Sequence, residues 1–219
     1  MKSAEGSTDV LLGIAGLASV ALATNIIANL VTGTEYKVFP YYKFVDLESS
    51  KEIAQVMSGY SDDEFIYKAW LLVSEGVQYV PVASDIVFTN GSVRCKSCLM
   101  PHQILAQENP KGNCVAKSAL LLSLLRHRFP PESVYLVMGQ LNVNGAGGHA
   151  WVELQRNNQW YVLESTISPR KTTARPAESL ALVYVPEVFV NDLYRHCLSG
   201  KVCIGVDKKG CPCYFENGV

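Results

Sequence analysis

The feature that most constrains this fold is a change of periodicity at Pro130 and Pro131. Before it, the run 115–125 is mostly apolar, which is typical of a core helix. The prolines cannot continue that helix, and beyond them the apolar residues alternate as they do in strands. The predicted strands are 133–139, 149–154 and 160–164. Helices followed by a run of strands predict an α+β fold with an antiparallel sheet.

Helical signals also lie upstream of that run. Ser61 is a candidate cap for a helix whose first turn is acidic, and this helix is predicted to end at Gly76. The segment 77–82 contains β-branched residues and a proline, so we expect it to be extended. The segment 101–107 is expected to form one or two helical turns before the turn 109–112.

The amino-acid composition favours a protein with a hydrophobic core and argues against nucleic-acid binding. The chain has 219 residues and a net charge of −1, and its lysines and arginines are scattered. A basic patch is the electrostatic signature of nucleic-acid binding, so we expect no nucleic-acid partner. The hydrophobic fraction of 48% is sufficient for a proper core. The length fits one domain plus an appendage.

The appendage is an uncharged apolar segment, 10–34, near the N-terminus. About 20 helical residues span a hydrocarbon core of roughly 30 Å, so the segment predicts a single-pass membrane anchor. A cleaved signal peptide and a soluble buried helix remain alternatives, although Glu5 and Asp9 make a poor positive flank for a signal peptide. Lysines after the span favour, slightly, a cytoplasmic body. The predicted division is 1–34 for the anchor segment and 35–219 for the globular domain.

The seven cysteines include at least one that is unpaired within the chain, because the number is odd. Cys95 and Cys98 have the two-residue spacing of a metal knuckle or a redox pair, and Cys211 and Cys213 could supply a second half of a structural zinc site. A mixture of free thiols and disulfides is the other interpretation. The compartment decides between them.

Cys114 stands apart from these cysteines because it opens the apolar helix, directly after Gly112 and Asn113. A thiol at a helix N-terminus lies near unpaired backbone N–H groups and the positive end of the helix dipole. Both favour the thiolate and make it a better nucleophile. Cys114 is therefore a candidate catalytic residue.

A nucleophilic thiol needs a base, and the base needs an orienting group. Among four histidines, His149 alone opens a predicted strand behind a glycine-rich approach, 145–148. If the turn after that strand is Asn157-Asn158, antiparallel pairing sets residue 164 opposite residue 151 and on the same face as His149. Glu164 is the only acid of its strand and would need a partner if half buried. His149 and Glu164 are thus the candidate base and acid.

The sequence resembles the transglutaminase-like superfamily of papain-type cysteine enzymes over about residues 60–167. The motifs that carry the resemblance are Gly112-Asn113-Cys114, the segment 148–153 (Gly-His-Ala-Trp-Val-Glu) and the segment 160–166 (Trp-Tyr-Val-Leu-Glu-Ser-Thr). The resemblance implies a nucleophile helix packed on an antiparallel sheet, with a Cys114–His149–Glu164 triad. The commonest acid in the family is Asp, so Glu164 is a departure. The cysteine-rich C-terminal extension lies outside the resemblance.

The activity implied by the resemblance is acyl transfer from a peptide or amide, with hydrolysis favoured over crosslinking and no cofactor required. The backbone N–H of Cys114 is a candidate oxyanion donor, and Gln78 and Tyr79 are candidates for a second. A membrane-tethered peptide-binding or scaffold domain with relict catalytic residues is the alternative. A thiol-redox role for Cys114 with Cys95 and Cys98 ranks last, because it gives His149 and Glu164 no function.

Overall fold

The computed structural model describes residues 37–81, 86–88, 92–95, 98–143, 146–166, 175–193 and 195–197. The helices are α2 (Leu47–Val56), α3 (Asp62–Gly76), α4 (Pro101–Leu105) and α5 (Cys114–Leu125), with short 3-10 turns η1 (Tyr41–Phe44), η2 (Pro131–Ser133) and η3 (Ala177–Leu180). The strands are β1 (Lys37–Pro40), β2 (Gln78–Tyr79), β3 (Ile86–Phe88), β4 (Ser92–Cys95), β5 (Lys111–Gly112), β6 (Val134–Asn142), β7 (Ala146–Arg156), β8 (Gln159–Leu163), β9 (Arg175–Pro176), β10 (Tyr184–Val190) and β11 (Arg195–Cys197).

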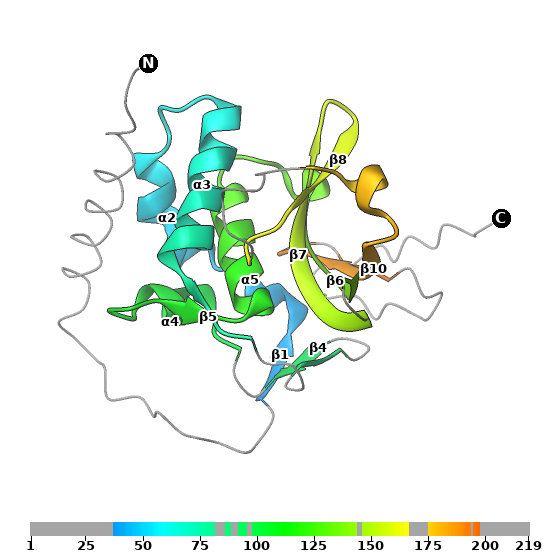
Figure 1. The fold of residues 1–219 in the computed structure, drawn as a ribbon. Helices are drawn as coiled ribbons and strands as arrows, with labels where there is room; N and C mark the ends of the chain where they lie inside the picture. The colour runs from blue at the N-terminus through cyan, green and yellow to red at the C-terminus, as the bar shows by residue number, and fades with distance from the viewer. Residues whose placement is uncertain are drawn as a thin grey trace.

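Helix α5 lies at the centre of the fold, between the other helices and the large sheet (Figure 1). Every side chain of α5 is buried. Its leucines pack against α3 on one side and against the inward-facing residues of β6 and β7 on the other. The apolar run that predicted a core helix therefore forms one, and the mixed helix-and-sheet fold agrees with the predicted α+β class.

The large sheet has the strand order β11-β10-β6-β7-β8-β9, and all its pairs are antiparallel. Strand β10 comes after β8 in sequence but pairs with β6, on the opposite side of β7. Its Tyr184 and Phe189, together with Trp151 and η3, pack on the face of the sheet that points away from α5. The sheet thus separates a large core from a smaller aromatic one.

Local signals placed α3 correctly. Ser61 accepts a hydrogen bond from the Glu64 backbone N–H, and the Glu64 side chain accepts one from the Ser61 N–H, which is a capping box. The helix ends at Gly76, as predicted. The short helix α4 and the extended β2 also lie within their predicted segments.

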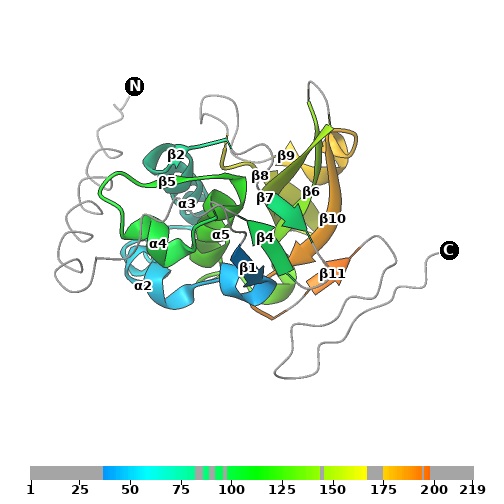
Figure 2. The same ribbon diagram turned by 90° about the horizontal axis from the view of Figure 1, so that it is seen from below.

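Two strands are longer than predicted. β6 continues to Asn142 and β7 begins at Ala146, before His149, because the glycines of this hairpin pair through their backbones, Gly148 with Gln140 and Gly147 with Leu141. A second, three-stranded sheet of order β1-β4-β3 was not predicted. It lies below α5 and the large sheet in the view of Figure 1, and so in front of them in Figure 2.

The predicted membrane anchor, 10–34, lies outside the described residues, so it stays a prediction. Among the residues that the structure describes, none forms a helix long and apolar enough to cross a bilayer.

Candidate active site

Cys114 is the first residue of α5 and the only free cysteine in the part of the chain whose side chains are described. Asn113 caps the helix, since its side-chain Oδ1 accepts a hydrogen bond of 3.0 Å from the Ala116 N–H. The N–H groups of a first helical turn have no intrahelical acceptor, so they are available to an anion beside the thiol.

The hairpin β7–β8 brings His149 and Glu164 together, as the parity argument predicts. Its turn is Asn157-Asn158, and both residues have the positive φ of a two-residue hairpin turn, 51° and 61°. Pairing runs from Arg156–Gln159 to Val152–Leu163. Glu164 follows directly, and its Oε2 lies 2.7 Å from His149 Nε2.

All three candidate residues are almost completely buried, with 5% of Cys114, 6% of His149 and 5% of Glu164 exposed. Because Nε2 of His149 is engaged by Glu164, Nδ1 is the ring nitrogen that remains for the Cys114 thiol, with which His149 also interacts. The helix terminus and the sheet thus bring a thiol, an imidazole and a carboxylate together in one buried cluster.

Three residues donate hydrogen bonds to the Glu164 carboxylate, and a fourth donates to its backbone oxygen. Oε1 accepts hydrogen bonds from the Thr166 N–H at 2.8 Å and the Thr166 hydroxyl at 2.6 Å. Oε2 accepts one from the Tyr184 hydroxyl at 3.1 Å, in addition to His149. The Trp70 indole N–H, from α3, donates to the Glu164 backbone oxygen at 2.8 Å. These contacts leave the carboxylate one orientation.

Aromatic side chains fix the plane of the His149 ring. Trp151 stacks on it with ring centroids 6.2 Å apart and an interplanar angle of 21°. Tyr184 lies on it at 6.4 Å with a tilt of 52°. Trp151 is itself held by a 2.9 Å hydrogen bond from its indole N–H to Glu153. The imidazole ring of His149 is therefore oriented both by hydrogen bonding and by packing.

The charges of the site stabilise one another. Burial lowers the pKa of His149, but hydrogen bonds to Cys114 and Glu164 and attraction to their charges outweigh it and raise that pKa to about 10. Burial acts to raise the pKa of Glu164, yet the bonds and charge of His149 and the bonds from Thr166 hold it below its usual range. An imidazolium at neutral pH is the form that pairs with a thiolate.

Side chains on the first turns of α5 fix the helix against its neighbours. The Ser118 hydroxyl donates to the Ala150 carbonyl, next to His149, at 3.1 Å. The buried Lys117 ammonium donates to the Ser74 and Val77 carbonyls, at and just beyond the C-terminal end of α3. Burial lowers the pKa of Lys117 to about 8, against the opposing attraction of Glu164.

Tyr79 lies near Cys114 at the rim of the site. Strand β2 pairs in parallel with β5, which sets Tyr79 against Gly112, two residues before Cys114. The side chain is 36% exposed. Burial, followed by the charges of Cys114 and Glu164, raises the pKa of Tyr79 to about 12, so its phenol remains a hydrogen-bond donor at neutral pH. Gln78, the other sequence candidate, is exposed.

The other candidate ligands and histidines lie elsewhere. Cys95 and Cys98 form a disulfide, whereas Cys211 and Cys213 lie outside the described residues, so the zinc site stays a prediction. Among described side chains, no group of three or more His, Cys, Asp or Glu residues could hold a metal ion. His102 pairs with Asp46 instead, at 2.8 Å.

Sequence reasoning missed the residues that support the acid. Thr166 follows Glu164 by two positions, and a hydroxyl so close in sequence indicates a candidate hydrogen-bond donor to the carboxylate. Tyr184 comes from a strand that begins twenty residues after Glu164, and no local pattern indicates that this strand pairs back on β6.

No protein-family model matches the chain, and a search of curated proteins gives no match.

Proposed function

We propose that the chain is a transglutaminase-like cysteine hydrolase or acyltransferase that acts on peptide or amide bonds, with hydrolysis as the principal outcome. The observation that carries the proposal is the buried 2.7 Å contact between His149 Nε2 and Glu164 Oε2, formed where the His149 ring also interacts with Cys114. Nucleophile, base and orienting acid are the three parts that covalent thiol catalysis needs.

In the proposed reaction, the Cys114 thiolate attacks the amide carbonyl carbon and forms a tetrahedral oxyanion. The Cys114 backbone N–H, at the start of α5, stabilises that oxygen, and the Tyr79 phenol is the proposed second donor. The C–N bond then breaks, and the His149 imidazolium gives its proton to the leaving amine.

The resulting thioester is resolved by an acceptor. With water, His149 takes a proton as the water oxygen attacks the thioester carbonyl, the C–S bond breaks, and a carboxylic acid leaves. With an amine, the same steps yield a new amide. Throughout, Glu164 stabilises the imidazolium and fixes which ring nitrogen faces the thiol.

Labelling with a panel of peptide electrophiles, with the modified residue identified by mass spectrometry, tests the proposal. We expect Cys114 to react selectively at pH 6–7, and His149→Ala to slow that reaction by about 100-fold or more. His102→Ala is the matched control, because His102 lies at the surface with Asp46. Equal labelling of Cys114 in the wild type and His149→Ala would contradict the proposal.

A further inference from the structure

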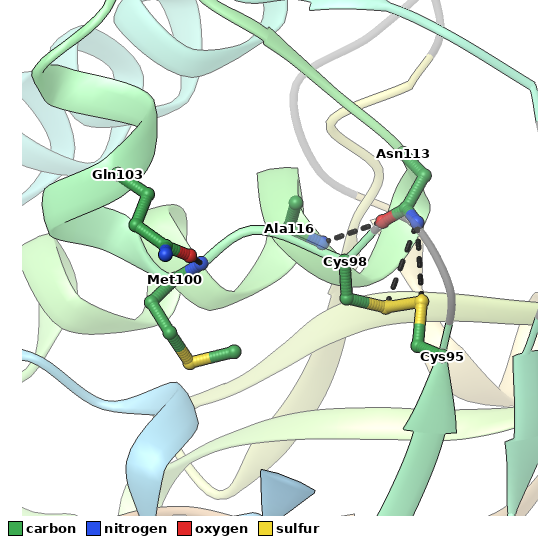
Figure 3. The surroundings of a disulfide bond; sticks show 6 residues. All are labelled: Cys95, Cys98, Met100, Gln103, Asn113 and Ala116. Carbon is green, nitrogen blue, oxygen red and sulfur yellow. Dashed lines mark hydrogen bonds between the residues drawn. A yellow bond between two sulfur atoms is a disulfide. The ribbon is translucent and has the colours of Figure 1, made fainter. Parts of the chain in front are cut away.

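A buried disulfide lies next to Asn113, the residue that caps the N-terminus of α5 (Figure 3). It joins Cys95, the last residue of β4, to Cys98, three residues before α4 begins. Neither sulfur-bearing side chain is open to solvent, with 0% of Cys95 and 3% of Cys98 exposed. The proposed acyl-transfer chemistry makes no use of this bond.

Asn113 connects the disulfide to α5. Its side-chain Nδ2 donates to both sulfurs, at 3.7 Å to Cys95 and 3.6 Å to Cys98. Its Oδ1 accepts the capping hydrogen bond from the Ala116 N–H. Figure 3 shows the two ends of this one amide pointing in these two directions. The next residue in the chain is Cys114, so the amide that contacts the disulfide also holds the first turn that carries the nucleophile.

We propose that Cys95 and Cys98 form a redox-modification site whose state controls the reactivity of Cys114 through Asn113. This inference rests on the function proposed above. A small dithiol is the class of reductant: it transfers two electrons and two protons, the Sγ–Sγ bond breaks, the reductant leaves as its own cyclic disulfide, and two thiols remain in the protein.

Reduction changes what Asn113 faces. In the disulfide the two bonded sulfurs lie together, and both accept from Nδ2. After reduction the two sulfurs move apart to van der Waals distance, so Nδ2 can no longer contact both, and each thiol gains an S–H donor that needs an acceptor. When the amide turns so that Oδ1 accepts from a thiol, Oδ1 is withdrawn from the Ala116 N–H. The first turn then loses its cap, and with it the placement of Cys114 beside His149.

Loss of an N-cap shifts the equilibrium between the ordered and the frayed first turn of a helix by roughly tenfold. We therefore expect the disulfide form to be the reactive one, and the dithiol form to react about tenfold more slowly at Cys114. The measurement is the rate of iodoacetamide modification of the Cys114 peptide, followed by mass spectrometry in the full-length protein. It is made on oxidised protein and on protein treated with dithiothreitol that is removed before alkylation.

Two variants separate the proposed route from other effects of the reductant. Cys95→Ser with Cys98→Ser should be slow under both conditions and insensitive to dithiothreitol, although all other cysteines remain. Asn113→Ser keeps a capping oxygen but has no amide to contact the sulfurs, so its Cys114 rate should be the same in the oxidised and reduced states. Circular dichroism establishes that each variant is folded; if the double variant is not, the wild type and Asn113→Ser still decide the matter.

Equal Cys114 rates in oxidised and reduced wild type would overturn the inference, as would a dithiothreitol effect that persists in Asn113→Ser or in a folded double variant. His149→Ala, measured on oxidised protein, separates this failure from failure of the proposed function. If His149→Ala slows Cys114 and reduction does not, only the redox control is wrong. If His149→Ala reacts at the wild-type rate, the catalytic proposal and the inference that rests on it both fail.

Discussion

Replacing Glu164 with glutamine tests whether the carboxylate charge controls the protonation of His149. The two side chains have nearly the same shape, so packing against Trp70 and Tyr184 should persist. The amide, however, has one acceptor and one donor end. Its oxygen must face Thr166, whose backbone N–H can only donate. Its NH₂ group then faces His149 Nε2, which must become an acceptor, so the imidazole proton moves to Nδ1 and points at Cys114.

The magnitude follows from the electrostatics of the pair. Raising the pKa of His149 from 6.5 to about 10 corresponds to roughly 5 kcal/mol of preference for the imidazolium. Cys114 and Glu164 share that effect. If Glu164 supplies about half, its loss reduces the imidazolium–thiolate population by about 100-fold. Under the proposed function, the wrong tautomer would lower the catalytic rate further, to a total loss of about 10⁴-fold as in a comparable triad.

The assay is the rate of iodoacetamide modification at the Cys114 peptide between pH 5 and pH 10. Wild-type protein should stay reactive at pH 6, because the imidazolium is retained up to the raised pKa of His149. Glu164→Gln should be about 100-fold slower at pH 6 and should recover as the pH becomes alkaline. Thermal unfolding provides the folding control. A folded Glu164→Gln protein with a wild-type pH profile would refute the reasoning.

Three further predictions follow from individual contacts. Tyr184→Phe removes one donor to Glu164 and should slow Cys114 alkylation about two- to tenfold. Burial lowers the pKa of Lys117 to about 8 in the folded protein, against 10.5 for the unfolded chain. Between these two pH values the unfolded chain binds more protons than the folded one, so the free energy of unfolding should rise with pH, by roughly 3 kcal/mol in total. Urea titrations should show Lys117→Met without this rise, whereas a parallel rise in both proteins would contradict it. Asn158→Ala, at φ 61°, should cost about 1 kcal/mol in thermal unfolding, and Asn158→Gly should not.

Local physical chemistry made much of this site predictable. The acidic first turn of α3, the proline stop after α5 and the Asn157-Asn158 turn are short-range signals, and each lies where the sequence indicates. The turn matters most, because a two-residue loop fixes the parity of every residue along the hairpin. That parity alone put His149 and Glu164 on one face.

What could not be predicted depends on contacts between distant segments. Strand β10 inserts beside β6, and its register shifts between Pro186 and Val188, so its sequence does not alternate cleanly. Its Tyr184 contact with Glu164 could not be inferred from local pattern. The bond from Trp70 to the Glu164 carbonyl spans 94 positions in the chain. Both contacts depend on how helices and strands pack together in the tertiary structure, which the secondary-structure propensity of each segment does not determine.

The register also shows how far the Glu164 side chain must reach to contact His149. Continuing the β7–β8 pairing sets residue 164 opposite Trp151, so its relation to His149 is diagonal rather than direct. Diagonal neighbours on a sheet are roughly 7–8 Å apart between backbones, against about 5 Å for direct pairs, and the additional methylene of glutamate spans part of that difference. Glu164→Asp keeps the charge but withdraws the carboxylate, so it should lose the 2.7 Å contact while retaining part of the electrostatic effect. Its Cys114 alkylation rate at pH 6 should fall between those of the wild type and Glu164→Gln, and an aspartate as reactive as the glutamate would show that reach is not what selected this residue.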